Sequence, residues 1–504
     1  MGTTYVAVVQ FDTRNLTYFT GVGNWSNAAR WTNGIPNATS SAFIYGTCTV
    51  DVNGTAYMLG VQPSASITIN TGINLVVVQQ TIVYSQSTGT GAIVQHGNFT
   101  GGPQCWFQRF TTGAVSHLIS SPLTNAKSGS FAGGFLTPFN EATNNWAANI
   151  TNSTTLLNAG KGYNLFTAST KLFVISGSNF NSGNITLSLP YSGPTKGANL
   201  IGNPYPCRLT LNNTTWTKNN VSNAIIAYNS TTGQYNAWNG TTGTGMLTGG
   251  VIAETQGFYV ESIGPAASIT IPEQSQTASF NNLFKSAINN QIRLAISGNN
   301  SSDEMIVLFN ENATTGLDHQ FDVQKEYGNI ESPQLFSITT DNNLTINCLP
   351  EVNSSVSVPV GLKVGANTTY TITASDLESF NAGTQIYLED LKAKKIVNLN
   401  EDASYTFDAN TNDMVNRFML HFGTPTSNSS AINAYAFENT IYVSNPSLVN
   451  INEVVVYNAL GQVVTSFKPE VTSLKGYSIN TAAGSYIVKI VADNKVVSNK
   501  INLK

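Results

Sequence analysis

Short apolar runs spaced about ten residues apart constrain what the first hundred residues of this chain can fold into. Five such runs occupy residues 48–50, 57–61, 66–69, 75–78 and 92–94. They are rich in β-branched residues, with Gly or Asn between most of them, and each is too short for a helix. Strands this short at so regular a step predict a stacked β-solenoid or a β-sandwich.

The composition extends this prediction to the whole chain of 504 residues. Only 10% of the residues are charged, against about 25% in an average protein, and Gly, Asn, Thr and Ser take their place. We therefore expect an all-β protein with many turns. A net charge of −4 argues against the basic surface that nucleic-acid binding requires. No run approaches the roughly 18 apolar residues that a transmembrane segment needs.

Charge is unevenly distributed along the chain. Residues 1–280 carry nine basic and six acidic side chains, whereas the remaining 224 residues carry thirty-five charged side chains. A composition break near residue 280 predicts a domain boundary. With the patterns below it divides the chain into four predicted domains. These are a β-solenoid or sandwich at residues 1–104, a duplicated β-module domain at 105–282, a β-sandwich at 283–424 and a C-terminal β-domain at 431–504.

Residues 105–282 contain similar segments in the same order, at offsets of 82 to 95 residues. His117–Leu123 resembles Asn199–Tyr205, and Gly160–Tyr163 resembles Thr255–Phe258. Two further pairs are Phe139–Trp146 with Tyr228–Tyr235, and Ile185–Pro190 with Ile269–Pro272. The pattern predicts two related β-modules in which Gly162 and Gly257 occupy equivalent positions.

The C-terminal residues read as strand, turn and strand. Val454–Val464, Ala483–Ile490 and Lys495–Lys504 are β-branched runs bounded by Asn and Gly, which predicts a small immunoglobulin-like sandwich. Their order and spacing resemble the C-terminal sorting domain of type IX secretion substrates of Bacteroidota. The residues that carry the motif are Gly461, Gly484, Tyr486, Lys489, Lys500 and Lys504.

This resemblance implies that the type IX machinery is a partner and that the protein reaches the cell surface or the medium. Such a substrate needs a leader to reach the periplasm. Residues 1–10 lack the basic start and the long apolar run of a signal peptide, so we expect that the leader has been removed or is missing.

Few residues suggest catalysis. Only His319 has a nearby carboxylate, Asp322, at ligand spacing, and a structural loop is the preferred interpretation. Glu254 and Glu261 are separated by an odd number of residues, so a regular strand would point them to opposite faces.

The acidic segment Asp408–Asp413 resembles a calcium loop but lacks its glycine and distal Glu, so we expect a solvated hairpin loop. We predict no enzymatic activity, no cofactor and no metal.

Aromatic residues interleaved with Asn and Gly offer another kind of site. Trp146, Tyr235 and Trp238 are candidates for stacking on a sugar, because aromatic faces supply apolar contact and amides supply hydrogen bonds. The alternative is that the tryptophans pack in the core. The four cysteines, Cys48, Cys105, Cys207 and Cys348, show no paired framework and are predicted to be free buried thiols, with one disulfide as the alternative.

These patterns together predict a secreted, non-enzymatic cell-surface protein with a structural or adhesive role, as a component of a surface layer, matrix or filament. The alternative is a glycan-binding module or a polysaccharide-acting enzyme. Because residues 1–280 carry few charges that could protect sheet edges, we expect self-association or binding to a surface glycan.

Overall fold

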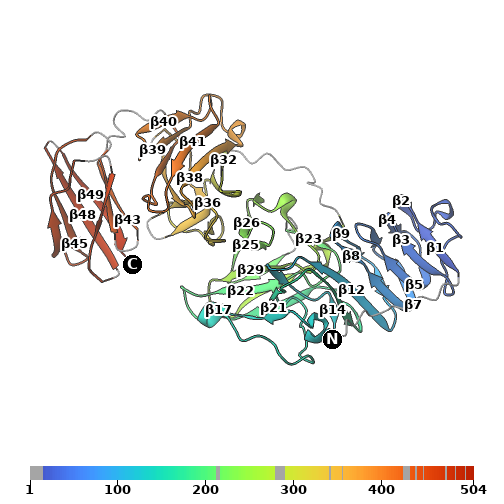
Figure 1. Ribbon diagram of the computed structural model, residues 1–504. Helices are drawn as coiled ribbons and strands as arrows, with labels where there is room; N and C mark the ends of the chain where they lie inside the picture. The colour runs from blue at the N-terminus through green and yellow to red at the C-terminus, as the bar shows by residue number, and fades with distance from the viewer. Residues whose placement is uncertain are drawn as a thin grey trace. The chain divides into compact units, whose positions relative to one another are not determined.

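The computed structural model describes residues 15–211, 216–278, 290–339, 342–354, 356–423, 432–437, 440–445, 448–471, 474–482, 484–493 and 495–503. Over these residues the protein is all-β, as predicted, with short 3-10 turns and no α-helix. It divides into two compact units, Met1–Phe284 and Lys285–Lys504 (Figure 1). The division into four domains stays a prediction, and its linker at 424–430 lies outside the described residues.

The first unit begins with a β-solenoid, which is one of the two folds that the sequence predicted. Parallel strands of one sheet are β1 (Leu16–Phe19), β3 (Ser41–Ile44), β5 (Gly54–Val61), β7 (Asn74–Val83) and β12 (Gln104–Thr111). Parallel strands of the second sheet are β2 (Val22–Asn24), β4 (Thr47–Val50), β6 (Ser66–Ile69) and β10 (Ala92–Gln95). Shorter elements here are η1 (Ala28–Arg30), β8 (Ser85–Gln86), β9 (Gly89–Thr90) and β11 (Asn98–Thr100). Because β1 to β6 alternate between the two sheets, the chain coils around a shared core.

One inward ladder shows how strands this short stabilise the coil. Phe19, Ile44, Val61, Val83 and Phe107 are register partners on successive strands of the first sheet. All five side chains are fully buried. Each strand therefore contributes one β-branched or aromatic side chain to a continuous stack. A single short strand could not bury such a side chain by itself.

The outer edge of β1, the first strand of this sheet, is covered. The main-chain N–H of Thr32 donates to the carbonyl of Tyr18 at 3.1 Å, and the side-chain amide of Asn33 donates to the carbonyl of Leu16 at 2.6 Å. The Thr17 hydroxyl donates to the carbonyl of Gly34 at 2.9 Å. The edge of β1 is thus occupied by the chain's own loop and is not free to pair with another molecule.

The solenoid continues into the next segment without a break in its core. β12 pairs antiparallel with β19 (Lys171–Gly177), and one core cluster extends from Phe19 to Phe180. In the second sheet, the N–H of Ile93 donates to the carbonyl of Pro206 at 2.9 Å. Both sheets are therefore continued or covered by the repeats that follow.

The two repeats pair their strands in the same order. The first contains β12, β13 (Ser116–Ile119), β14 (Leu123–Thr124), η2 (Ser128–Phe131), β15 (Phe135–Thr137), β16 (Phe139–Asn140), η3 (Glu141–Thr143), β17 (Asn145–Trp146), β18 (Tyr163–Phe166), β19 and β20 (Asn179–Phe180). The second contains β21 (Ile185–Leu189), β22 (Ala198–Gly202), β23 (Arg208–Thr210), β24 (Thr217–Asn219), β25 (Val221–Asn229), β26 (Gln234–Asn239), β27 (Thr244–Gly245), η4 (Thr248–Gly250), β28 (Val251–Ile252), β29 (Gly257–Ser262), β30 (Ala267–Ile271), η5 (Glu273–Ser275) and β31 (Gln276–Thr277). β13 pairs with β18 as β22 pairs with β29, and β14 pairs with β20 as β23 pairs with β31. Even the register agrees, since Ile119 faces Tyr163 and Ile201 faces Phe258.

The repeats contact each other reciprocally. Lys161 of the first repeat bridges to Ile201 of the second, and Gln256 of the second bridges to Ile119 of the first. Since Lys161 corresponds to Gln256 and Ile119 to Ile201, the contact has the form of a two-fold symmetric dimer interface within one chain.

Gly162 and Gly257 occupy equivalent places at this contact, which confirms that prediction. A methyl group on Gly162 would lie 2.5 Å from the carbonyl oxygen of Ile201, and one on Gly257 would lie 3.0 Å from the nitrogen of Ile119. Glycine is required at both because backbone approaches backbone.

One pair of segments was wrongly assigned as counterparts in the two repeats. Ile185–Pro190 and Ile269–Pro272 are not counterparts, because β21 and β30 pair with each other, Ile185 facing Ile271. By pairing, the counterparts of β21 and β30 are β12 and β19. Neighbouring strands of one sheet need the same alternation of apolar residues, so their sequences resembled each other without being repeats.

The second unit contains one large sheet that curls around a core. Its order is β40-β39-β42-β37-β35-β36-β33-β32-β38-β41, with β34 paired to β36. The bounds are β32 (Gln291–Gly298), β33 (Ser301–Phe309), β34 (Val323–Gln324), β35 (Gln334–Ile338), β36 (Asn343–Leu349), β37 (Ser357–Lys363), β38 (Thr368–Ser375), η6 (Leu377–Ser379), β39 (Tyr387–Asp390), β40 (Lys395–Asn398), β41 (Ser404–Ala409) and β42 (Phe418–His421). Strands from both ends of this order contribute to one apolar cluster. The sheet is therefore nearly closed, in the manner of a barrel, and differs from the two stacked sheets of the sandwich predicted for residues 283–424.

The C-terminal residues form the predicted immunoglobulin-like sandwich. One antiparallel sheet contains β43 (Asn433–Phe437), β44 (Thr440–Ser444) and β47 (Leu474–Ser478). The other contains β45 (Ile451–Asn458), β46 (Val463–Phe467), β48 (Gly484–Ala492) and β49 (Lys495–Leu503). Ile441 of the first sheet and Val454, Val488 and Ile490 of the second are fully buried in one core, as the sandwich fold requires.

The four cysteines are free and buried, which confirms the first interpretation and excludes the disulfide. Burial raises the pKa of the Cys105 thiol and of the Cys348 thiol to about 12. Both thiols are therefore protonated at neutral pH and act as small apolar side chains.

Candidate functional site

The three predicted sugar-stacking residues do not share one surface. Trp238 is only 1% exposed and lies in the core of the second repeat, so its assignment as a glycan contact was wrong. Trp146 is 37% exposed, and Tyr235 is partly exposed. Tyr235 and Trp238 are three residues apart on β26, which places them on opposite faces of that strand.

The structure instead brings together a row of five rings, which we call the aromatic row: Trp146, Phe139, Tyr259, Tyr235 and Tyr228. The ring centroids of Trp146 and Phe139 are 5.4 Å apart, and those of Phe139 and Tyr259 are 5.2 Å apart. Those of Tyr259 and Tyr235 are 6.2 Å apart, and those of Tyr235 and Tyr228 are 5.2 Å apart. The first three contacts are edge-to-face, a favourable geometry for neighbouring rings.

The repeat explains how the row is built. Phe139 faces Trp146 across the β16–β17 hairpin, and Tyr228 faces Tyr235 across β25 and β26. These two pairs are counterparts in the sequence repeat. Tyr259 of β29 joins them, and it was missed because no local motif marks it. The alternation of buried Phe258 and Val260 around it was the available signal for an outward ring.

A cavity of about 240 Å³ adjoins the row at Phe139 and is also lined by Asn158, Lys161 and Leu187. Glu141, at its edge, accepts hydrogen bonds from the N–H and hydroxyl of Ser192 and from the N–H of Gly197. Burial alone would raise the pKa of Glu141, but these hydrogen bonds hold the pKa below its ordinary value. The carboxylate therefore anchors a loop.

The carboxylate of Glu254 is also engaged. Its Oε1 lies 3.1 Å from Nε of Arg208, and its carbonyl accepts from Arg109 at 3.2 Å. Burial raises the pKa of Glu254, and the two arginines oppose that rise. Glu254 is 4% exposed and clamped by arginine, whereas a general acid must reach its substrate.

His421 lies in a polar relay that resembles a hydrolytic triad. One ring nitrogen, Nδ1, is 2.8 Å from the Ser357 hydroxyl, and the other, Nε2, is 2.8 Å from Glu389. Hydrolytic triads use these nitrogens the other way round, with the carboxylate at Nδ1. His421 is 5% exposed, and both of its ring nitrogens have a hydrogen-bond partner. The relay therefore links β37, β42 and β39, which is the structural role of a buried histidine.

Asp322, the carboxylate next to His319 in the sequence, organises a loop. It accepts the N–H of Asp318 and the N–H of Cys348, each at 2.7 Å. Burial raises the pKa of Asp322 to about 6 in spite of these hydrogen bonds. Among the described residues, no group of three or more His, Cys, Asp or Glu could hold a metal ion.

Asp322 should make the second unit more stable at mildly acidic pH. The folded carboxyl binds a proton below about pH 6 and the unfolded one below 3.8, so the folded state holds more protons between these values. Lowering the pH from 7 to 5 is expected to stabilise the protein by about 1 kcal/mol relative to Asp322→Asn. Urea midpoints of both proteins at pH 5, 6 and 7 measure the difference, and parallel pH profiles would contradict it.

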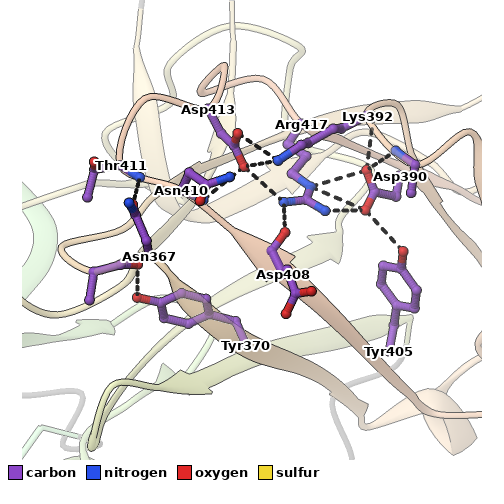
Figure 2. A network of polar contacts seen from close by, with 12 residues as sticks. Asn367, Tyr370, Asp390, Lys392, Tyr405, Asp408, Asn410, Thr411, Asp413 and Arg417 are labelled. Atoms are coloured by element: carbon purple, nitrogen blue, oxygen red, sulfur yellow. Dashed lines mark hydrogen bonds and ion pairs between the residues drawn. The ribbon is translucent and has the colours of Figure 1, made fainter.

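The acidic loop at Asp408–Asp413 is held by cations of the protein itself (Figure 2). Nη1 of Arg417 donates to the carbonyl of Asp408 at 2.8 Å and to Oδ2 of Asp413 at 3.2 Å, and Nζ of Lys392 lies 2.7 Å from both Asp413 oxygens. The Asp413 carboxylate is therefore paired with a guanidinium and an ammonium group, while the Asp408 carboxylate accepts the Thr369 hydroxyl at 2.7 Å.

Comparison with known proteins identifies the family of this fold. A family model described as a domain of unknown function, DUF8693, matches residues 18–422. The chain belongs to this family. No curated protein matches the chain. Among solved structures, it resembles the BSP domain of a biofilm-associated protein with 11% identity and a TM-score of 0.20, over 79% of this chain and 92% of that one.

The DUF8693 region contains the aromatic row and the Arg417 network, whereas the residues of the predicted sorting motif follow it. Gly461 has a φ of +78° in the turn after β45, and Gly484 begins β48. Tyr486 is buried, and its hydroxyl donates to the carbonyl of Ala482 at 2.6 Å. Lys489 and Lys500 lie on β48 and β49, and Lys504 lies outside the described residues.

Within the described residues, no helix has the length and apolar character needed to cross a membrane.

Proposed function

We propose that this DUF8693 protein is a non-enzymatic cell-surface protein with a structural or adhesive role, exported by the type IX machinery of Bacteroidota. The observation that carries the proposal is the C-terminal sandwich, whose motif residues divide between its core and one outer face. Tyr486, Val488 and Ile490 alternate inward and are buried.

The residues between them face outward and are available for recognition. Ile487 is 45% exposed and faces the exposed Lys500, and Lys489 faces Val455 and Ser498. Ile487 and Lys489 therefore share one apolar and basic face with Lys500. A partner that recognises the motif contacts this face, whereas Tyr486 stabilises the fold that presents it.

The remaining architecture supports a structural or adhesive role. Glu141 and Glu254, two of the six carboxylates before residue 280, are held by hydrogen bonds and an ion pair rather than placed as an open catalytic pair. The covered edge of β1 leaves less room for strand addition between molecules. Of the two expected partners, a second copy and a surface glycan, the aromatic row favours the glycan.

Removal of residues 431–504 is expected to abolish surface export and to leave the protein in the periplasm. The test expresses the full chain and the truncated chain behind an export leader in a Bacteroidota host and measures surface, medium and periplasmic fractions. As a matched gain-of-function control, a periplasmic reporter fused to residues 431–504 should reach the surface. Unchanged surface levels after truncation would refute the proposed export.

A further inference from the structure

We propose that the aromatic row is a binding site for an uncharged polysaccharide chain lying along the surface of the duplicated modules. The proposal deepens the adhesive role above and rests on it for its biological setting. The row is formed by both repeats, since Phe139 and Trp146 come from the first and Tyr228, Tyr235 and Tyr259 from the second.

The rings are exposed enough to bind and fixed enough to be pre-formed. Trp146 is 37% exposed, the other four rings are partly exposed, and each ring contacts the next in the row. Fixed rings lose little conformational freedom on binding, which favours affinity. Sugar rings present apolar C–H faces that stack on such rings.

The hydroxyl groups of the row suit a sugar. Three of its five rings are tyrosines, Tyr228, Tyr235 and Tyr259, and each is partly exposed. A tyrosine hydroxyl both donates and accepts hydrogen bonds, as a sugar hydroxyl does. The row therefore combines apolar faces with neutral hydrogen-bonding groups.

Charge around the row argues for an uncharged ligand. The carboxylate of Glu141 is 4% exposed and satisfied by Ser192 and Gly197. Lys161 lines the cavity beside Phe139, and Lys196 is close enough to Glu141 to help lower its pKa. Glu261 follows Tyr259 on the same face of β29, so the two lysines are balanced by Glu141 and Glu261. An acidic or a sulfated polymer would meet no net complementary charge here.

The adjoining cavity argues for a chain on the surface rather than an enclosed small molecule. Its 240 Å³ is below the roughly 300–1,000 Å³ of pockets that enclose small ligands. Protein interfaces are also enriched in Tyr, Trp and Phe, so a second copy of this chain is the alternative occupant that the experiment below tests.

Affinity gel electrophoresis of the full chain tests the site. The probes are soluble starch, hydroxyethylcellulose and galactomannan as neutral polymers, and alginate and dextran sulfate as charged ones. At least one neutral polymer should retard the wild type. Trp146→Ala combined with Tyr235→Ala should weaken that binding at least about tenfold. The matched control is Phe135→Ala, which removes a 59% exposed ring outside the row and should bind normally.

Folding of each variant is checked by circular dichroism, and Trp146→Ala alone, on a short exposed hairpin, provides a milder variant. Absence of retardation by every neutral polymer would overturn the site. Binding of a neutral polymer that the ring variants leave unchanged would also overturn the site, and so would binding of charged polymers alone. A change in sedimentation rather than in polymer binding would assign the row to self-association. None of these outcomes depends on the export route, which the truncation tests separately.

Discussion

Replacing Arg417 with alanine is expected to lower the free energy of unfolding of the second unit by about 3–5 kcal/mol. The guanidinium is 4% exposed and makes a bidentate pair with Asp390, with Nε–Oδ1 at 3.1 Å and Nη2–Oδ2 at 2.7 Å. Removing it leaves the fully buried Asp390 carboxylate without its counter-charge. An uncompensated buried charge is among the most destabilising changes known.

The position of Arg417 in the sheet explains why the loss should affect the whole unit. Asp390 ends β39, whereas Tyr405 and Asp408 belong to β41 at the other end of the strand order. Arg417 bonds to Asp390 and to the carbonyl of Asp408, and Tyr405 donates to Asp390 at 3.1 Å. The network thus closes the curled sheet with side chains where backbone pairing stops (Figure 2).

The distribution of tryptophan makes this measurement specific. All six tryptophans lie before residue 239, so tryptophan fluorescence reports only on the first unit, while far-ultraviolet circular dichroism reports on both. In a denaturant titration, Arg417→Ala should shift the circular dichroism transition and leave the fluorescence transition in place. Lys475→Ala, which breaks an exposed ion pair with Glu470, is the control and should leave both transitions unchanged. Equal shifts in the two variants would contradict the role of the network.

Local patterns were sufficient to predict much of the fold. A solenoid was one of the two folds predicted from runs such as 48–50 and 66–69, because each turn of a solenoid repeats a short strand with an inward apolar pattern. The two related modules followed from segments matched in order, among them those with Gly162 and Gly257, where the structure brings backbone against backbone. Both signals are local in sequence, and each is repeated.

The aromatic row and the Arg417 network could not be predicted in the same way. Tyr259 meets Phe139 only because the two repeats pack together, and Asp390 meets Tyr405 only because a sheet curls until its ends approach. Strand periodicity assigns faces but not curvature. Trp238 is different, since its three-residue separation from Tyr235 already predicted opposite faces.

Replacing Lys325 with methionine is expected to cost about 3–5 kcal/mol in the same unit. Nζ of Lys325 lies 2.5 Å from Oδ2 of Asp303, and the two side chains are 1% and 6% exposed. Asp303 also accepts the N–H of Leu335 at 2.6 Å. Methionine fills the space of the lysine stem but leaves the Asp303 carboxylate buried with one hydrogen bond and no cation.

The double variant Lys325→Met with Asp303→Asn separates the charge effect from packing. Asparagine keeps an acceptor for the N–H of Leu335 and removes the uncompensated charge, so the double variant should recover most of the loss. Circular dichroism midpoints of the wild type, both single variants and the double variant complete a double-mutant cycle. A double variant as unstable as Lys325→Met would show that the lysine acts through packing, and the buried ion pair would then not be the reason that both charges are tolerated in this core.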